Sequence, residues 1–378
     1  MMNITEMKRI VHIDLNAFFV QCEILKNPEL KSKPVAIGSN SKRSVISTAS
    51  YEARKYNVNS AMPVAIAKQN CPSLILIEPH FSLYKQYSNK FFDFLKSKYK
   101  ILEVASIDEC FIDMSEESKD VDDIHSYLFD LQMELFRKTD LKCSIGCSYN
   151  RFLAKMASDM KKPLGLTIIN KEDVEKLIWP LSIDKFYGIG KKTAPQLKEY
   201  GIKTIGDLAK CDDIRVKKFL SNQFETLKNT ACGSSSDFVD NLSYLPKSIS
   251  SERTFSEDLY DFDDLKVCLI DCCKQVYYEL KKYNLKSHTI SLKWRYNDFT
   301  TKSKQVTLFE DIKDLNHLTN EAIKILNMIY DNKPIRLLGV SLENLTLNDT
   351  RDYELLDNIN SQLKFGGKIM YGKDKYEN

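Results

Sequence analysis

Two adjacent carboxylates interrupt an apolar strand pattern, and this interruption constrains the fold more than any other feature. The run from Val104 to Asp113 is apolar apart from Ser106, Asp108, Glu109 and its last residue. Such a run predicts a pair of buried strands, where charges are costly unless they are paired or bind a cation. Adjacent strand residues point to opposite faces. Asp108 and Glu109 can therefore share a site only where a strand ends or turns, either as an ordinary surface turn or as a metal-binding hairpin tip.

A second strand pattern also ends in an acid. Residues 9–14 form a short β-branched run that closes on Asp14, and the apolar segment 15–20 follows it. If the two strands lie side by side, Asp14, Asp108 and Glu109 can point to one place, where their oxygens suit Mg²⁺. Two such ions stabilise both the attacking and the leaving oxygen of a phosphoryl displacement. Asp14 could instead cap the helix expected from Phe18, or serve in both ways.

Composition sets few limits on binding partners. The chain has 378 residues, enough for several domains, and its net charge of +3 is too small to indicate nucleic-acid binding. Between Lys281 and Lys304, however, seven basic residues and one acid are interleaved with Trp294, Tyr296 and Phe299. This stripe is typical of a phosphate-contacting surface. A solvated strand face is the alternative.

The ten cysteines form neither a disulfide-like framework nor a CxxC motif. Most lie in apolar segments, which predicts reduced thiols in a cytoplasmic protein. Cys268, Cys272 and Cys273 have helical spacing, but the five histidines lie elsewhere, so we expect no zinc site. No apolar stretch has the length of a membrane span, and the N-terminus shows no targeting pattern. We therefore expect no membrane partner.

The first 170 residues alternate short apolar strands with amphipathic helices. We expect strands at 9–14, 34–38, 44–48, 74–78, 101–107, 110–114, 142–148 and 166–169. Helices are expected to begin near Phe18, Tyr51, Pro63, Tyr84, Asp123 and Arg151. This order is the split βαβ pattern. It predicts a central antiparallel sheet that carries the acids, with helices behind it.

From residue 171 the pattern becomes helical. Gly188 and Gly190 precede a helix that ends near Gly201. Two helices joined by a Gly-x-Gly turn can bind a phosphate through exposed backbone amides, and Lys191 and Lys192 favour contact with a DNA backbone. An ordinary αα-corner is the alternative.

After a polar linker we expect a third unit, with helices at 263–283 and 315–331 and strands at 288–296, 303–309 and 335–342, followed by a helix in the tail.

Several ordered blocks of sequence together resemble the Y-family, or translesion, DNA polymerases of the DinB type. The blocks are Ile13–Phe19, Ser47–Arg54, Ala105–Glu109, Leu153–Lys155, Asp159–Pro163, Gly188–Gly190, Glu252–Phe255 and Leu292–Thr301. The resemblance implies an α+β multidomain fold. Its parts would be a palm at 1–17 and 80–170 with a split βαβ antiparallel sheet, small fingers at 18–79, a helical thumb with a helix-hairpin-helix at 171–236, a linker at 237–247, an α/β little finger at 248–347, and a UmuC-like tail at 348–378.

The resemblance also assigns site residues. Asp14, Asp108 and Glu109 would be catalytic and would bind two Mg²⁺ ions, which Mn²⁺ can replace, with the Leu15 carbonyl as a further oxygen. The residues implied to bind the nucleotide are Phe18, Phe19, Thr48, Tyr51, Arg54 and Lys162, with Phe19 as the steric gate that excludes a 2′-hydroxyl. Those implied to bind DNA are Gly188, Gly190, Lys191, Lys192, Lys293, Arg295, Lys302 and Lys304.

Two residues depart from the family pattern inside these blocks. Asn16 replaces an acid that is frequent two places after the first metal ligand. Because the ligands themselves remain, we expect altered tuning of the site and retained activity. Asn57 stands where relatives often have glycine, and asparagine tolerates the left-handed conformation that such a helix end needs.

The activity implied by the resemblance is template-directed, low-fidelity translesion DNA synthesis in DNA repair and damage tolerance. The partners would be primer–template DNA and an incoming dNTP, and the protein would act as a monomer. The glutamine-led clamp-binding peptides of the family match Gln305–Phe309, which lies in an expected strand, and less well Gln362–Phe365. The replication sliding clamp is thus a further candidate partner.

Two other functions are compatible with parts of this pattern. A palm-type nucleotide cyclase could use the same carboxylates, but it needs neither the Phe19 gate nor a basic third unit. A catalytically inactive DNA-binding scaffold would not need Asp14, Asp108 and Glu109.

Overall fold

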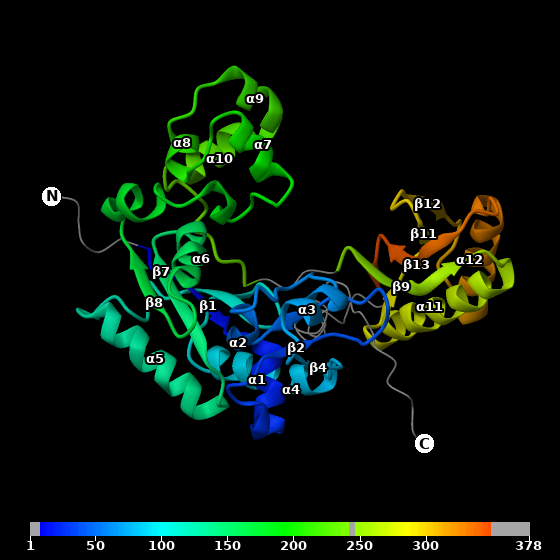
Figure 1. Ribbon diagram of the computed structural model, residues 1–378, viewed down its shortest axis with the longest axis horizontal. Helices are drawn as coiled ribbons and strands as arrows, with labels where there is room; N and C mark the ends of the chain where they lie inside the picture. The colour runs from blue at the N-terminus through cyan, green and yellow to red at the C-terminus, as the bar shows by residue number, and fades with distance from the viewer. Residues whose placement is uncertain (1–7, 242–245, 349–378) are drawn as a thin grey trace. The chain divides into compact units, whose positions relative to one another are not determined.

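A computed structural model describes residues 8–241 and 246–348 of the chain (Figure 1). The chain divides into two compact units. One unit comprises Met1–Lys31 and His80–Leu242, and the other comprises Ser32–Pro79 and Ser243–Asn378. Within the described ranges, no helix is both long and apolar enough to cross a membrane.

A five-stranded sheet forms the centre of the first unit, in the order β5-β6-β1-β7-β8. Its strands are β1 (Ile10–Leu15), β5 (Leu102–Val104), β6 (Glu109–Asp113), β7 (Cys143–Ser148) and β8 (Leu166–Ile169). β1 pairs antiparallel with both β6 and β7. The expectation of a wholly antiparallel sheet is wrong at one edge, where β8 runs parallel to β7. The reason is that the chain crosses from β7 to β8 through a helix, as parallel neighbours require.

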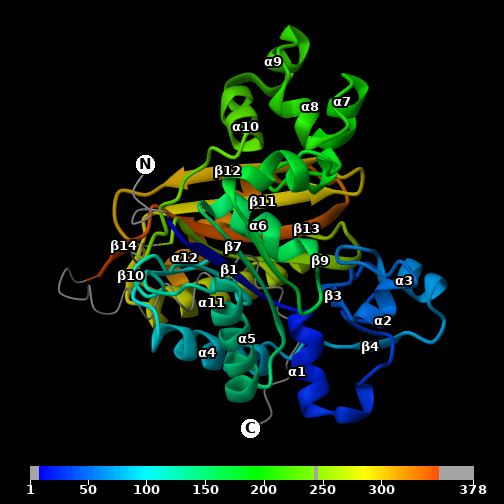
Figure 2. The ribbon, with the colours of Figure 1, turned by 90° about the vertical axis from the view of Figure 1, so that its left-hand side faces the viewer.

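Helices cover both faces of this sheet (Figure 2). On one face α6 (Arg151–Met160) packs against β1, β7 and β8. On the other, α5 (Ile124–Thr139) packs against β7 and β8 and also against α4 (Phe81–Lys96), which contacts α1 (Phe18–Lys26). Gly146 of β7 lets α6 lie close, because a Cβ at this position would stand 2.1 Å from the Ala154 carbonyl oxygen of that helix.

Short helices follow the sheet in the same unit. They are α7 (Thr193–Glu199), α8 (Ile205–Ala209), α9 (Ile214–Leu220) and α10 (Phe224–Ala231). Their apolar residues share one core with Phe152 and Met156 of α6. Gly188 precedes α7 with a φ of 107°, a conformation that glycine adopts without strain.

Residues 32–79 form a small sheet in the order β3-β2-β4. The elements are β2 (Val35–Ile37), β3 (Thr48–Ala49), α2 (Tyr51–Arg54), α3 (Val64–Asn70) and β4 (Ile75–Ile77). The strand expected at 44–48 is wrong except at its last residue, because the Ile46 backbone bonds to Ala61 and Met62 instead. Asn57 has a φ of 60°, so it adopts the left-handed conformation predicted for it.

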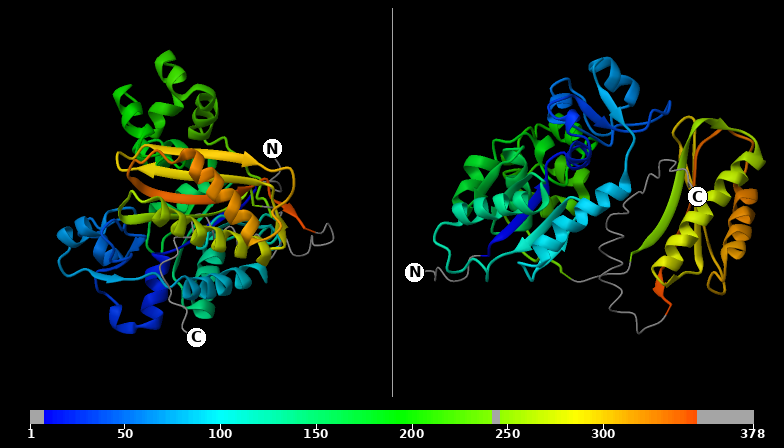
Figure 3. Two further views of the ribbon diagram at one scale, coloured as in Figure 1. Left: turned by 90° about the vertical axis from the view of Figure 1, so that its right-hand side faces the viewer. Right: turned by 90° about the horizontal axis from the view of Figure 1, so that it is seen from below.

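The described residues from 246 onward form a four-stranded antiparallel sheet in the order β12-β11-β13-β9. Its elements are β9 (Ser248–Leu259), α11 (Phe262–Lys282), β11 (Thr289–Tyr296), β12 (Thr301–Thr307), α12 (Leu315–Ile329) and β13 (Ile335–Glu343), with a short pair β10 (Leu285–Lys286) and β14 (Thr346–Leu347) beside it. Both long helices lie on one face (Figure 3). Strand β9, rich in Ser and Glu, was not predicted, and the expected tail helix lies outside the described residues.

Candidate active site

Asp14 and Glu109 lie opposite each other on the paired strands β1 and β6. Since alternate strand residues share a face, both side chains point to the face that α6 covers. Asp108 lies in the bend just before β6, and its carbonyl oxygen accepts a hydrogen bond from the Leu15 N–H at 2.9 Å. The two strand ends therefore bring the three acids near one another, as the sequence pattern predicts. Asp14 does not cap α1, whose N-cap position is Ala17.

Two lysines from α6 and the loop after it contact these carboxylates. The Lys155 Nζ is 2.8 Å from Glu109 Oε2 and 3.0 Å from Asp14 Oδ2. The Lys162 Nζ is 2.7 Å from Asp14 Oδ2 and 2.7 Å from Asp159 Oδ1. Burial opposes the charge of Lys155, but Asp14 and Glu109 outweigh it and hold the pKa of Lys155 above its usual value.

Lys155 lies in a block that matches the family, but the sequence pattern assigned it no role. The sequence does contain an indication of a role, because Lys155, Asp159 and Lys162 have the spacing i, i+4, i+7, which places residues on one side of a helix. What the spacing could not show is that this side faces Asp14.

The acids differ in their readiness to ionise. Burial, followed by the charges of Asp14 and Glu109, raises the pKa of Asp108 to about 6, although Ser106 Oγ donates a hydrogen bond to its carboxylate at 2.6 Å. Burial also opposes ionisation of Glu109, but contact with His12 and the charge of Lys155 hold the pKa of Glu109 below its usual range. Burial and the charges of its two neighbours thus act in the same direction on Asp108.

His12 lies two residues before Asp14 on β1, so its side chain is on the same face of the sheet as Asp14 and Glu109. It is fully buried. Its Nδ1 is 2.8 Å from Ser158 Oγ of α6, and its Nε2 is 3.5 Å from Glu109 Oε2. Burial lowers the pKa of His12, so the ring is neutral at pH 7. The ring therefore adds no positive charge beside Glu109.

The donor set fits a hard divalent cation. Carboxylate oxygens at neighbouring strand ends are the ligands that Mg²⁺ prefers, and the charges of Asp14 and Glu109 add to the effect of burial in raising the pKa of Asp108, against the opposing charge of Lys155. Within residues 8–241 and 246–348, no three His, Cys, Asp or Glu side chains are already gathered as a metal-binding group. The carboxylates of Asp14 and Glu109 contact the two lysines instead.

The residues expected to contact a nucleotide fall in both units. Phe19 is half-buried at the start of α1, next to Phe81, whereas Phe18 is buried and its side chain serves packing. Thr48, Tyr51 and Arg54 belong to the second unit, at β3 and α2. There the Arg54 guanidinium lies 4.6 Å from the centre of the Tyr51 ring.

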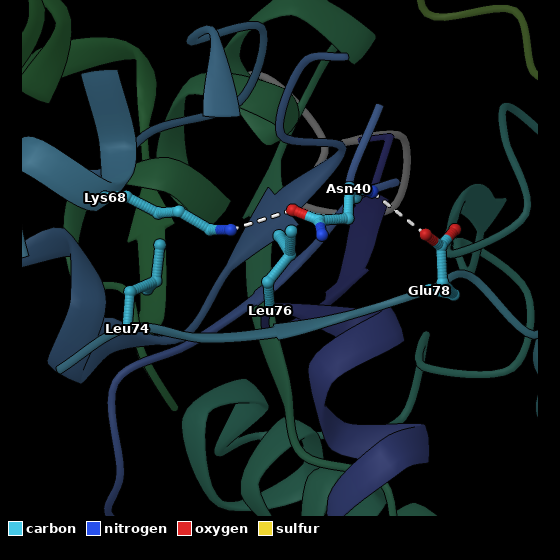
Figure 4. Close-up of a pocket in the computed structure, with 6 residues that line it drawn as sticks. Asn40, Lys68, Leu74, Leu76 and Glu78 are labelled. Carbon is cyan, nitrogen blue, oxygen red and sulfur yellow. Dashed lines mark hydrogen bonds between the residues drawn. The ribbon is translucent and has the colours of Figure 1, made fainter. Parts of the chain in front are cut away.

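A cavity of about 290 Å³ lies within residues 32–79. Its lining is Gly38, Asn40, Lys68, Leu74, Leu76 and Glu78. Asn40 bonds to both charged residues of the lining (Figure 4). Its Oδ1 accepts a hydrogen bond from Lys68 Nζ at 2.8 Å, and its backbone N–H donates one to Glu78 Oε1 at 2.9 Å. None of the predicted site residues lines this cavity.

The basic residues of the four-stranded sheet point to two different faces. Lys293 and Arg295 alternate with buried residues of β11 and so point away from α11 and α12. Lys302 and Lys304 pair with Trp294 and Leu292 and therefore lie on the helix side of the edge strand. The predicted interleaving of basic and aromatic side chains on one surface is wrong for Trp294 and Tyr296, which are buried.

The Gly-x-Gly turn presents its backbone openly. Apart from the glycine itself and its two chain neighbours, no atom lies within 4 Å of the position that a Cβ would take at Gly188 or at Gly190. Lys191 and Lys192 follow at the surface. This turn is therefore accessible to a phosphate, as the sequence predicts.

Comparison with known proteins decides the family. The impB/mucB/samB family matches residues 13–159, its C-terminal domain matches 246–355, and the IMS family helix-hairpin-helix motif matches 171–202. DNA polymerase IV of Oceanobacillus iheyensis is 38% identical over 94% of this chain and 83% of its own length. DNA polymerase IV of Clostridioides difficile is 34% identical over 93% and 98%. The chain belongs to the DinB-type Y-family DNA polymerases.

Solved Y-family structures share the fold. A Dbh–Dpo4 Y-family polymerase chimera superposes with a TM-score of 0.80 at 26% identity, over 90% of this chain and 100% of the other. DinB from Sulfolobus solfataricus gives a TM-score of 0.62 at the same 26% identity and the same coverage. These matches and the motif at 171–202 confirm the predicted α+β multidomain Y-family fold and its helix-hairpin-helix.

Proposed function

We propose that this protein is a template-directed, low-fidelity translesion DNA polymerase that adds dNTPs to a primer 3′-end during DNA damage tolerance. The observation that carries the proposal is the set of three acids, Asp14, Asp108 and Glu109, at adjoining strand ends of a Y-family chain. Its partners are primer–template DNA and an incoming dNTP, and a solved relative is an insertion ternary complex of Dbh DNA polymerase. The protein acts as a monomer. Since the matched relatives include bacterial enzymes, we place it in the cytoplasm, with the chromosome.

In this proposal the primer 3′-hydroxyl attacks the α-phosphate of the dNTP and pyrophosphate leaves. Asp14, Asp108, Glu109 and the Leu15 carbonyl would hold two Mg²⁺ ions, or Mn²⁺, and the bound ions would supply charge stabilisation to the attacking and leaving oxygens. Lys162 offers a positive charge to the triphosphate beside Asp14. Catalysis is then mostly positioning and electrostatics.

The remaining assignments follow the resemblance. Thr48, Tyr51 and Arg54 bind the triphosphate, where the hydroxyls donate hydrogen bonds and the guanidinium neutralises charge. We assign the palm to 1–17 and 80–170, the fingers to 18–79, the thumb to 171–236, the linker to 237–247 and the little finger to 248–347. The thumb turn, Lys293 and Arg295 contact the DNA backbone, and Lys302 and Lys304, which lie on the helix side of the sheet, contribute less to this contact. Their exposure or accessibility supports this role.

Primer extension tests the proposal directly. With a primed template, Mg²⁺ and all four dNTPs, the wild-type protein is expected to extend the primer and to insert opposite an abasic site. Asp108→Ala should abolish extension, because a metal-binding carboxylate is lost. Asp120→Ala, which removes an exposed carboxylate of the first unit, is the matched control and should retain activity.

The rival functions give different results in the same assay. A nucleotide cyclase would release a cyclic nucleotide without a primer, and an inactive scaffold would bind the primed template without extending it. Either result, or equal extension by wild type and Asp108→Ala, would remove the polymerase assignment.

The sliding clamp is a further partner in the proposal. Gln305 and Thr307 of the candidate segment lie in edge strand β12 with exposed side chains, and Phe309 just beyond it is fully exposed. The strand therefore leaves these three side chains accessible to a partner groove, whereas Val306 and Leu308 of the same segment pack against the core, as expected of a strand. Phe309→Ala should weaken stimulation by the clamp of the same organism and leave unstimulated extension unchanged. The second candidate, Gln362–Phe365, lies outside the described residues.

A further inference from the structure

Asn16 is a buried polar residue with both ends of its amide in use. It is 4% exposed. Its Nδ2 donates to Ser144 Oγ of β7 at 2.9 Å, and its Oδ1 accepts from the backbone N–H of Leu164 at 2.8 Å. Its backbone N–H also bonds to the Lys142 carbonyl at 2.9 Å. The side chain is therefore held firmly enough to fix what it contacts.

What Asn16 contacts is the loop that carries Lys162. This loop runs from Lys161 to Gly165, between α6 and β8. It is tightly bent, since Leu164 has a φ of 61° and a Cβ at Gly165 would stand 2.4 Å from the Lys161 carbonyl oxygen. The Gly165 N–H bonds to Ser144 Oγ at 3.2 Å, so Asn16 and Ser144 together hold the loop.

Two contacts thus join the same pair of segments. The second contact lies two residues further along each segment than the first. The Asp14 carboxylate contacts Lys162 Nζ at 2.7 Å, and the Asn16 amide contacts Leu164 at 2.8 Å. The first link weakens when Lys162 turns to a triphosphate, because the triphosphate then competes with Asp14 for the N–H donors of its ammonium. The second link does not depend on Lys162, so it can keep the loop in place during that change.

We propose that Asn16 is a positioning residue that holds the Lys161–Gly165 loop so that Lys162 can bind the incoming triphosphate. This inference rests on the proposed polymerase function. Asparagine performs the task without a charge and with both bonds, whereas an aspartate would keep the acceptor for Leu164 and lose the donor to Ser144 Oγ. Asn16 therefore acts through the loop and is not itself a metal ligand.

The test measures equilibrium dNTP binding to the full-length protein on a primed template that ends in a dideoxynucleotide, where no chemistry occurs. Asn16→Leu, which removes both hydrogen bonds, is expected to weaken dNTP binding on the order of tenfold and to leave DNA binding unchanged. Asn16→Asp, which retains the acceptor for Leu164, should restore dNTP affinity to within about threefold of wild type. If Asn16→Leu does not fold, Asn16→Ala takes its place with the same expected result.

A double-mutant cycle separates positioning from a general structural role. If Asn16 acts through Lys162, the double variant Asn16→Leu/Lys162→Ala should bind dNTP no more weakly than Lys162→Ala alone. Additive losses, or unchanged dNTP affinity in Asn16→Leu and Asn16→Ala, would overturn the inference. A wild-type protein that binds primed DNA but neither binds nor incorporates dNTP would instead overturn the proposed function.

Discussion

The ring of Phe19 is stacked on the ring of Tyr84, with centroids 4.3 Å apart and planes 11° from parallel. Tyr84 is fully buried in α4, and its hydroxyl donates to Glu23 Oε1 at 2.6 Å. His80 Nδ1 lies 2.8 Å from the same oxygen. The half-buried Phe19 ring therefore lies against a ring that cannot readily move. A side chain that excludes a hydroxyl by steric contact needs such a fixed position.

Replacing Phe19 with alanine should raise ribonucleotide incorporation. The bulky ring is the proposed barrier to a 2′-hydroxyl, and its loss should lower the dNTP-over-rNTP ratio of kcat/KM on the order of a hundredfold. Single-nucleotide insertion of dCTP and rCTP opposite the same template base measures this ratio. Tyr84→Phe, which keeps the stacked ring and loses only the bond to Glu23, is the matched control and should shift the ratio by a few-fold at most. Unchanged sugar discrimination in Phe19→Ala would remove its gate role.

The sequence was sufficient to place the three acids because strand patterns have a period of two and their ends are marked. In the sequence pattern Asp14 closes one strand and Asp108 and Glu109 stand between two others, so the observed pairing of Asp14 with Glu109 only completes what the pattern implies. Lys155 could not be placed in this way. Its contact with the acids depends on how closely α6 crosses β1, which Gly146 of another strand permits.

The same period of two explains why the predicted basic and aromatic surface of the four-stranded sheet is wrong. Lys293 and Arg295 alternate with Trp294 and Tyr296 along β11, so the basic and aromatic side chains must point to opposite faces. A stripe that looks continuous in the sequence is therefore divided by the sheet. The contact between Asn16 and Leu164 could not be predicted for another reason. It joins residues far apart in the chain, and no periodicity in the sequence indicates such a hydrogen bond.

The stability of the metal-free protein should depend on pH through Asp108. Its pKa is raised from 3.8 to about 6, mainly by burial, so the folded state binds this proton more tightly than the unfolded chain does. Stability is therefore lost as the pH rises from 3.8 toward about 6 and is not regained above it. Asp108→Asn removes this loss and should be more stable than wild type by up to about 3 kcal/mol at pH 7.5, and by little near pH 4.

Urea unfolding in EDTA at both pH values measures this difference. Added Mg²⁺ provides the control, because it should stabilise the wild type and have a much smaller effect on the variant, which lacks a metal-binding carboxylate. A stability difference between Asp108→Asn and wild type that is the same at both pH values would show that burial of the charge is not its cause.

Lys155→Met should destabilise the metal-free protein by about 3 kcal/mol, since it leaves Asp14 and Glu109 partly buried and without their shared partner. Thermal and urea unfolding in EDTA measure the loss. Lys198→Met is the matched control, because it breaks a pair with Asp184 in which both side chains are well exposed, and such pairs contribute less than about 1 kcal/mol. Equal effects of the two variants would mean that the Lys155 contacts do not stabilise the site.

The two faces of the four-stranded sheet should differ in their contribution to DNA binding. Lys293 and Arg295 point from the face that α11 and α12 leave uncovered, where a duplex can lie flat, whereas Lys302 and Lys304 lie on the helix side. The paired variants Lys293→Ser/Arg295→Ser and Lys302→Ser/Lys304→Ser remove the same charge from each face. They are therefore matched controls for each other.

Affinity for a primed duplex across a salt series distinguishes the two variants. Each lost phosphate contact lowers the slope of log K against log salt by about 0.9, so the first variant should lose close to two units of slope and the second much less. Lys293 must also give up its 2.6 Å contact with Glu252 to reach a phosphate, and for that reason the loss should fall slightly short of the full value. A larger change in slope for Lys302→Ser/Lys304→Ser would place the duplex on the other side of the sheet.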